Sequence, residues 1–79
     1  MPHVTAPRWR RGPKGRLLAD VGQFRLEAHA GPGRLRTARF MVLRRQYGPG
    51  SLFALVASGA APSLFAAMCA AERAAGRFI

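Results

Sequence analysis

The middle of the chain combines a continuous apolar run with closely spaced arginines. Residues 40–43 are apolar at four successive positions, within a stretch, 34–45, that also carries five arginines. Because side chains alternate across a strand, a half-buried strand is polar at every second position, whereas this stretch is apolar on both sides. Such a strand lies inside a sheet or presents one apolar face to a partner. We therefore expect a central strand over about residues 35–45 whose second face binds a partner.

The segment before this strand has the alternation of another strand. Residues 17–21 and 23–29 together predict one strand, interrupted by Gly22, which we interpret as a bulge or kink. From Phe24 onward, apolar and polar positions alternate regularly, as expected for a strand with one buried face. This pattern predicts the first strand of a sheet.

Glycine and proline interrupt the chain on both sides of the central strand. Residues 31–33 and 48–50 are both Gly-Pro-Gly, which favours tight turns because glycine adopts positive φ without steric cost. Residues 52–57, after the second turn, predict a short apolar third strand. This order of strands and turns is typical of an antiparallel meander. Neither turn is followed by Gly-Lys-Ser or Gly-Lys-Thr, which argues against a phosphate-binding P-loop.

The C-terminal part of the chain predicts a helix over residues 64–75. Ser63 is a suitable N-cap, alanines are strong helix formers, and Gly76 is expected to end the helix at the C′ position. At about 100° per residue, one apolar stripe should cover the sheet. The residues of this stripe are Leu64, Phe65, Met68, Ala71 and Ala75. Glu72 lies near its edge, where it is expected to pair with a strand arginine.

The predicted fold class is therefore α+β, a three-stranded antiparallel meander with one C-terminal helix packed on one face. This single domain covers residues 17–79. Residues 1–16 contain prolines at positions 2, 7 and 13 and predict a basic arm that is disordered or loosely docked. Within this arm Trp9 lies among arginines, so it either stacks on bases beside phosphate-binding arginines or folds back onto the core.

The distribution of charge points to an anionic partner. The chain has 79 residues, with 13 basic and 3 acidic side chains and a net charge of +10. Residues 1–16 and 34–45 each hold five basic residues and no acid. A GC-rich genome explains a preference for arginine over lysine, but it does not explain the shortage of acids. Two basic segments of this kind are typical of contact with an anionic surface.

The parity of the central strand determines which side chains the open face of the sheet displays. With Phe40 and Val42 turned to the helix, that face carries Arg25, Glu27, His29, Arg39, Met41, Leu43 and Arg45. With the reverse parity, it displays Arg36, Phe40, Val42 and Arg44. Both alternatives give an apolar surface with an arginine rim, as in a protein interface, unless the tail or arm covers it. The candidate residues for binding a partner or nucleic acid are Arg8, Trp9, Arg10, Arg11, Lys14, Arg16, Arg25, Arg36, Arg39, Met41, Leu43, Arg44 and Arg45.

Groups for catalysis or metal binding are few. The acids, at positions 20, 27 and 72, are too far apart in the sequence to predict a pair of catalytic carboxylates. His3, His29 and Cys69 lack the CxxC or HxxxH spacing of a zinc site, and nothing in the sequence predicts an activated thiol. We therefore expect no enzymatic activity, no metal, no cofactor and no small-molecule substrate.

A membrane span is not expected, although residues 46–71 carry no charge. Glycine, proline and serine interrupt this segment, and its strongly apolar parts at 52–57 and 64–71 are each too short to cross a bilayer. The basic N-terminal segment is not followed by the apolar core of a signal peptide. A single cysteine excludes an internal disulfide bond. We expect a cytoplasmic protein of a bacterial host.

The chain from Gly22 to Glu72 resembles small proteins encoded by phage and prophage accessory genes. In these proteins two or three strands lead through an Ala-Ser-Gly … Ser-Leu-x-x-Ala segment, here residues 57–67, into an alanine-rich helix. Some of them are anti-CRISPRs, compact inhibitors that bind a host effector complex without catalysis. The resemblance implies a non-enzymatic inhibitor that binds a host nucleoprotein effector through the arginine-rimmed sheet face and the basic arm, blocking nucleic-acid engagement.

The charge limits how such an inhibitor would work. Anti-CRISPRs that mimic DNA are acidic, so this basic chain would instead bind an acidic effector surface, plug a site by shape, or engage the nucleic acid. One alternative is a small basic protein that binds DNA or RNA directly and largely non-specifically. The alanine-rich helix is unsuited to reading bases in a groove. A virion component is a third possibility, and the chain is expected to be a monomer or a homodimer.

Overall fold

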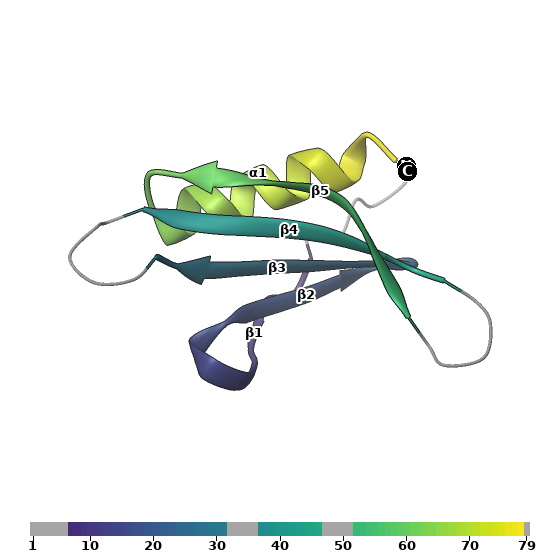
Figure 1. The fold of residues 1–79 in the computed structure, drawn as a ribbon, viewed down its shortest axis with the longest axis horizontal. Helices are drawn as coiled ribbons and strands as arrows, with labels where there is room; N and C mark the ends of the chain where they lie inside the picture. The colour runs from purple at the N-terminus through teal and green to yellow at the C-terminus, as the bar shows by residue number, and fades with distance from the viewer. Residues whose placement is uncertain (1–6, 32–36, 47–51, 79) are drawn as a thin grey trace.

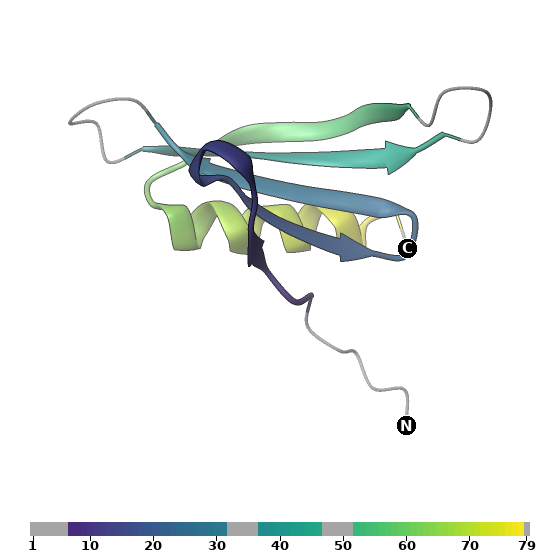
Figure 2. The same cartoon turned by 90° about the horizontal axis from the view of Figure 1, so that it is seen from below.

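The fold consists of a five-stranded antiparallel sheet with an α-helix across one of its faces (Figure 1). This computed structural model describes residues 7–31, 37–46 and 52–78. The strands follow one another in chain order across the sheet, and the turned view in Figure 2 shows the helix as a second layer. The elements are β1 (Arg10–Arg11), the 3-10 helix η1 (Pro13–Gly15), β2 (Leu17–Val21), β3 (Phe24–Ala30), β4 (Ala38–Arg45), β5 (Phe53–Ala61) and α1 (Leu64–Gly76).

The α+β meander with a C-terminal helix on one face is confirmed, but the prediction of three strands is wrong. Residues 17–29 do not form one strand, because Gly22 lies in a turn instead of a bulge. Val21 pairs with Phe24, so the loop between β2 and β3 has only two residues. Gly22 has a φ of 58°, and its successor Gln23 has no positive φ. Glycine at the first of two loop positions is typical of a type II′ turn, whose twist matches that of the flanking strands.

The N-terminal segment supplies the other additional strand. Arg10 and Arg11, expected in a disordered or loosely docked arm, pair with Leu18 and Leu17 of β2. The chain then reverses through η1, where Lys14 and Gly15 have φ values of 59° and 74°. A left-handed lysine is uncommon, and its backbone strain is tolerated only because the pairing on both sides holds the turn. Positions 1–6 of the expected arm lie outside the described residues.

The core lies between α1 and the face of the sheet that carries Leu26 and Val42. These two are the largest fully buried side chains, and Phe40 packs beside them, so the parity with Phe40 and Val42 facing the helix is the one adopted. The buried apolar residues are Ala19, Phe24, Leu26, Ala28, Ala38, Val42, Ala67, Ala71 and Ala75. Because the helix contributes only alanines to this list, it can approach the sheet closely.

The ends of α1 differ in how well the sequence predicted them. Ser63 is the N-cap, since its Oγ accepts a hydrogen bond from the backbone N–H of Ala66 at 3.1 Å. Gly76 is not a left-handed C′ residue; it ends the helix itself, and the N–H of Arg77 reaches the last carbonyls. No helix in the described parts of the chain is long and apolar enough to cross a membrane.

Phe65, expected in the buried stripe of the helix, is 71% exposed. The buried line of α1 runs through Ala67 and Ala71, which are spaced by four residues. At about 100° per residue, Phe65 lies roughly 160° around the helix from Ala67. The stripe is therefore centred on small side chains, and the larger Phe65 points away from the sheet.

Gly59 should not tolerate a side chain. It lies opposite Phe40 in the β4–β5 pair, and a β-carbon at this position would lie 2.8 Å from Cε1 of the Phe40 ring. Because that ring packs against the core, we expect Gly59→Ala to lower the free energy of unfolding by about 1–3 kcal/mol. Urea denaturation measures the change. Ser58→Ala, at an exposed neighbouring position, is the control and should stay within about 0.5 kcal/mol of the unmodified protein. Equal stability of the two variants would contradict the steric explanation.

Candidate functional site

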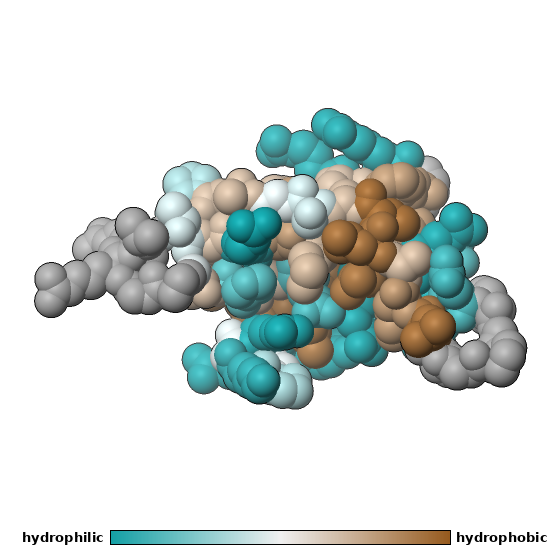
Figure 3. Space-filling model, in the orientation of Figure 1, coloured by the Kyte–Doolittle hydropathy of each residue, from teal (hydrophilic) through white to brown (hydrophobic). Residues whose placement is uncertain are grey.

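The sheet face opposite α1, which we call the open face, is not covered by the helix. The strand register places Leu43 of β4 between Arg25 of β3 and Leu55 of β5 on this face. Met41 lies one row away, between Glu27 and Ser58. Figure 3 looks onto the open face and shows an apolar patch over β4 and β5, with hydrophilic side chains around it. The open face is therefore the surface on which apolar and charged groups meet.

A bulge in β5 creates much of this patch. Val42 pairs with Ala57, but the next residue, Leu43, pairs with Leu55, so Val56 is an extra residue in β5. Because one inserted residue reverses the alternation of a strand, Leu55 and Phe53 change from the helix side to the open face. Leu55 is 56% exposed as a result. We define the apolar patch as Met41, Leu43, Phe53 and Leu55.

Two arginines are positioned by the aromatic ring of this patch. The guanidinium carbon of Arg25 lies 4.6 Å from the ring centroid of Phe53, and that of Arg45 lies 5.6 Å from it. Both distances are within the range of cation–π attraction. The ring therefore holds the two guanidinium groups at the rim of the apolar patch.

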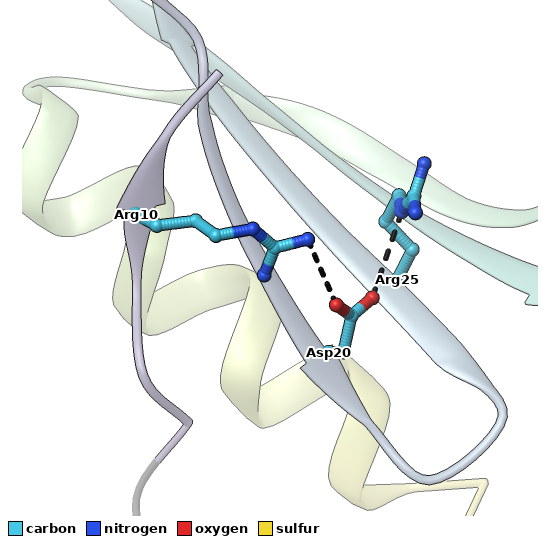
Figure 4. A network of polar contacts seen from close by, with 3 residues as sticks. All are labelled: Arg10, Asp20 and Arg25. Carbon is cyan, nitrogen blue, oxygen red and sulfur yellow. Dashed lines mark ion pairs between the residues drawn. The ribbon is translucent and has the colours of Figure 1, made fainter.

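An ion-pair network extends from this rim to the N-terminal edge of the sheet (Figure 4). Asp20 of β2 lies 2.9 Å from Nη2 of Arg10 and 3.5 Å from Nε of Arg25. The second contact is long, and the buried Nε of Arg25 forms no hydrogen bond. The Asp20 and Arg10 side chains are each about half exposed, so the network contributes little stability. The network places the Asp20 carboxylate between Arg10 and Arg25 at the edge of the apolar patch.

A cleft of about 300 Å³ opens beside this network, between η1 and β3. Glu27 on its wall is largely buried and lies 3.2 Å from Nη1 of Arg16. This pair neutralises one of the basic side chains of the cleft, and Asp20 shares its single charge between Arg25 and Arg10. The residues that line the cleft are Pro13, Lys14, Arg16, Leu18, Arg25 and Glu27.

The acidic side chains of the chain, three in all, lie within the described residues and are engaged inside the fold. Asp20 contacts two arginines, Glu27 contacts one, and Glu72 accepts a hydrogen bond from Trp9. Within the described structure, Arg39 and Arg45 therefore form no ion pair. The rim of the apolar patch carries uncompensated positive charge.

Trp9 folds back onto the core, which is one of the two alternatives that the sequence left open. Its indole Nε1 donates a hydrogen bond to Oε2 of Glu72 at 2.8 Å, and its ring packs against both clusters of buried residues. The expected pairing of Glu72 with a strand arginine is thus replaced by a bond to Trp9. This contact joins the N-terminal segment to α1, 63 positions later in the chain.

We expect Trp9→Phe to lower the free energy of unfolding by about 1–2 kcal/mol, because Glu72 would lose its partner in a partly buried place. A double-mutant cycle with Glu72→Ala, which removes the acceptor oxygen, tests this explanation by urea denaturation. A coupling energy of about 1 kcal/mol between the two substitutions would support the hydrogen bond. Additive effects would instead assign the loss to ring packing alone.

The structure brings together about half of the candidate residues predicted from the sequence. Those on the open face are Arg10, Arg16, Arg25, Arg39, Met41, Leu43 and Arg45. By its pairing with Phe24, Arg44 belongs to the helix side of the sheet, and Arg11 does so by its pairing with Leu17. Arg8 precedes β1, and Lys14 lies at the cleft. Arg36 lies outside the described residues.

Sequence reasoning did not identify Phe53 and Leu55 as candidate binding residues. Both lie in the apolar stretch that predicted the third strand, but the phase change at Val56 was needed to turn them outward. No three His, Cys, Asp or Glu side chains of the described structure gather as a metal site would require. The expectation of a non-enzymatic protein without metal stays a prediction.

Comparison with known proteins does not assign the chain to a family. No protein-family model matches the chain, and neither a curated protein nor a solved structure gives a significant match. The resemblance to phage and prophage accessory proteins therefore stays a hypothesis.

Proposed function

We propose that this protein is a non-enzymatic binding module whose open face docks onto an acidic protein surface. The observation that carries the proposal is the apolar patch, framed by Arg39 and Arg45, which have no carboxylate partner in the described structure. An apolar centre with a charged rim is the usual composition of a protein interface. The rim charge selects a partner that presents carboxylates around an apolar area.

The composition of the patch favours a protein over a nucleic acid. Sheet faces that bind single strands display free aromatic rings on which bases stack. Three of the four side chains of this patch are aliphatic or methionine, and its single ring, Phe53, already has Arg25 and Arg45 close to it. Bases would therefore gain little stacking here, whereas apolar side chains of a protein would gain burial.

We further propose that the partner belongs to a nucleic-acid-processing complex of a bacterial host. The protein would inhibit this complex as anti-CRISPRs do. Enzymes of this kind gather carboxylates around magnesium ions at their reaction centres. Arginines on a rigid sheet can pair with such carboxylates and hold the apolar patch against the surrounding surface. Binding there would block the approach of the nucleic acid. The resemblance of residues 22–72 to phage accessory proteins supports this form of the proposal.

A second candidate is direct binding of DNA or RNA. The observation that favours it is the net charge of +10, together with the internal pairing of Asp20, Glu27 and Glu72. Arginines without carboxylate partners are available for phosphates. In that case the apolar patch would contribute little, and affinity would depend on salt in proportion to the number of phosphates contacted.

Leu55→Gln distinguishes binding of an acidic protein from direct binding of DNA or RNA, because Leu55 is an exposed member of the apolar patch. The tagged protein is incubated with a nuclease-treated bacterial lysate, and the captured proteins are quantified by mass spectrometry. We expect a specific acidic partner whose capture falls about tenfold or more in Leu55→Gln. In parallel, fluorescence anisotropy follows labelled single-stranded and duplex DNA from about 50 to 200 mM salt. Two results together would contradict the proposal. The first is that no protein is captured from the nuclease-treated lysate. The second is micromolar DNA binding that falls steeply with salt and is unchanged in Leu55→Gln.

A further inference from the structure

β5 forms one border of the sheet, and among the described residues no strand pairs with its outer edge. It has nine residues, whereas the opposite border, β1, has two, and both of those are arginines. None of the nine residues is buried, and Figure 2 shows that α1 covers the face of the sheet instead of this border. An edge strand with free N–H and C=O groups is a template for another strand.

β5 has little of the protection that isolated edge strands usually carry. Edges are normally blocked by charged side chains, proline or a bulge. β5 contains neither a charged residue nor a proline, and its single bulge lies at Val56. Beyond that bulge, residues 57–61 are Ala-Ser-Gly-Ala-Ala and pair regularly with β4. The regular half of β5 is thus uncharged and free of large side chains, and it contains no bulge.

We propose that β5 pairs antiparallel with β5 of a second copy of this chain. A second copy fits this edge because an uncharged strand is complementary to itself, whereas an acidic peptide would find no arginine on β5 to pair with. The two-fold axis of such a pair is perpendicular to the sheet. Both open faces then lie on one side and both α1 helices on the other. Five strands from each copy give one continuous sheet, in which the two apolar patches belong to a single surface.

Salt distinguishes this self-association from binding of an acidic partner. Each copy carries a net charge of +10, so the two copies repel one another until salt screens them. The screening length falls from about 10 Å at 0.1 M to about 3 Å at 1 M ionic strength. The dimer should therefore tighten with salt, whereas an arginine-rimmed contact with an acidic partner weakens. The proposal concerns the protein alone and does not depend on the identity of that partner.

Sedimentation equilibrium of the full chain at low and high salt tests the proposal. We expect a monomer–dimer equilibrium with a dissociation constant on the order of 10 μM, because one strand pair is a small interface. The constant should fall about tenfold between about 0.1 and 1 M salt. Ser58→Lys should weaken the dimer about tenfold or more, since an antiparallel pairing centred near Gly59 places the two lysines close together. Ser58 is exposed, so the variant retains the core.

Two control variants make the outcome specific to β5. Gln23→Lys adds the same charge in the exposed β2–β3 turn and should leave the dimer unchanged. Met41→Gln alters the open face and should also leave it unchanged. A wild-type monomer up to millimolar concentration would overturn the proposal, as would a dimer lost in Met41→Gln and kept in Ser58→Lys.

Hydrogen exchange gives a test that needs no variant. Raising the protein concentration should slow exchange of the β5 amides that do not bond to β4, at residues 57–61 in particular. Concentration-dependent protection confined to other strands, or to α1, would overturn the proposal even if a dimer is found.

Discussion

Replacing Arg39 and Arg45 together with glutamate should weaken partner binding by about 100-fold or more, while the domain remains folded. Two attractive contacts become repulsive, and a loss of about 2.7 kcal/mol corresponds to that factor. Both arginines are exposed, and neither forms an ion pair within the described residues, so the substitution removes no buried contact. Among the described residues, the interaction that the substitution removes is the small cation–π contact of Arg45 with Phe53. Titration calorimetry with the captured partner measures the affinity, and circular dichroism checks the fold.

Arg73→Glu with Arg77→Glu is the matched control for this experiment. It changes the net charge by the same amount, but both residues are exposed on the helix or at its end, away from the open face. We expect this control to change affinity by no more than about threefold, as long-range charge alone would do. Equal losses in the two double variants would mean that net charge, instead of the open face, determines binding.

Leu26→Ala should leave much of the protein unfolded at room temperature. Leu26 is 0% exposed and is one of the two largest fully buried side chains. Removing such a side chain costs about 2–5 kcal/mol, including the cavity that remains. A domain of this size has a total stability on the order of 5 kcal/mol, so this single loss is comparable to the whole. Circular dichroism during urea denaturation measures the unfolded fraction.

The same substitution at Leu55 is the control for burial. Leu55 is 56% exposed on the open face, so Leu55→Ala should change the free energy of unfolding by less than about 1 kcal/mol. A similar cost at both positions would show that the open face is covered in solution, which would argue against a free binding surface there.

Much of the fold could be predicted from local patterns. The alternation from Phe24 onward, the apolar run at 40–43 and the cap at Ser63 each depend on neighbours within a few residues. The division of residues 17–29 into β2 and β3 could not be predicted in this way. A one-residue bulge and a two-residue turn at Gly22 shift the alternation alike, so the pattern fits both. Only the length argued for two strands, since 13 residues exceed the usual length of one.

The candidate site was predicted in part, because only some of its residues are placed by local alternation. Arg39, Met41 and Leu43 lie at alternate positions, so any strand through them places them on one face. Phe53 and Leu55 join them only because the bulge at Val56 changes the phase of β5, and no local pattern marks that position. The patch was therefore predicted without its most exposed member.

Local residue patterns were enough to predict the periodicities of strand and helix, the start of the helix, and an apolar strand with arginines beside it in a basic chain. These features depend on residue type and on spacings of two to four positions. Tertiary structure alone decided which face the helix covers, that Trp9 bonds to Glu72, and that Asp20 links Arg10 to Arg25. The first two depend on packing between segments distant in the chain, whereas the Asp20 contacts depend on the pairing of β1 with β2 and of β2 with β3. The buried Leu26 and Val42, with the ring of Phe40 against Gly59, select the face of the sheet that the helix covers.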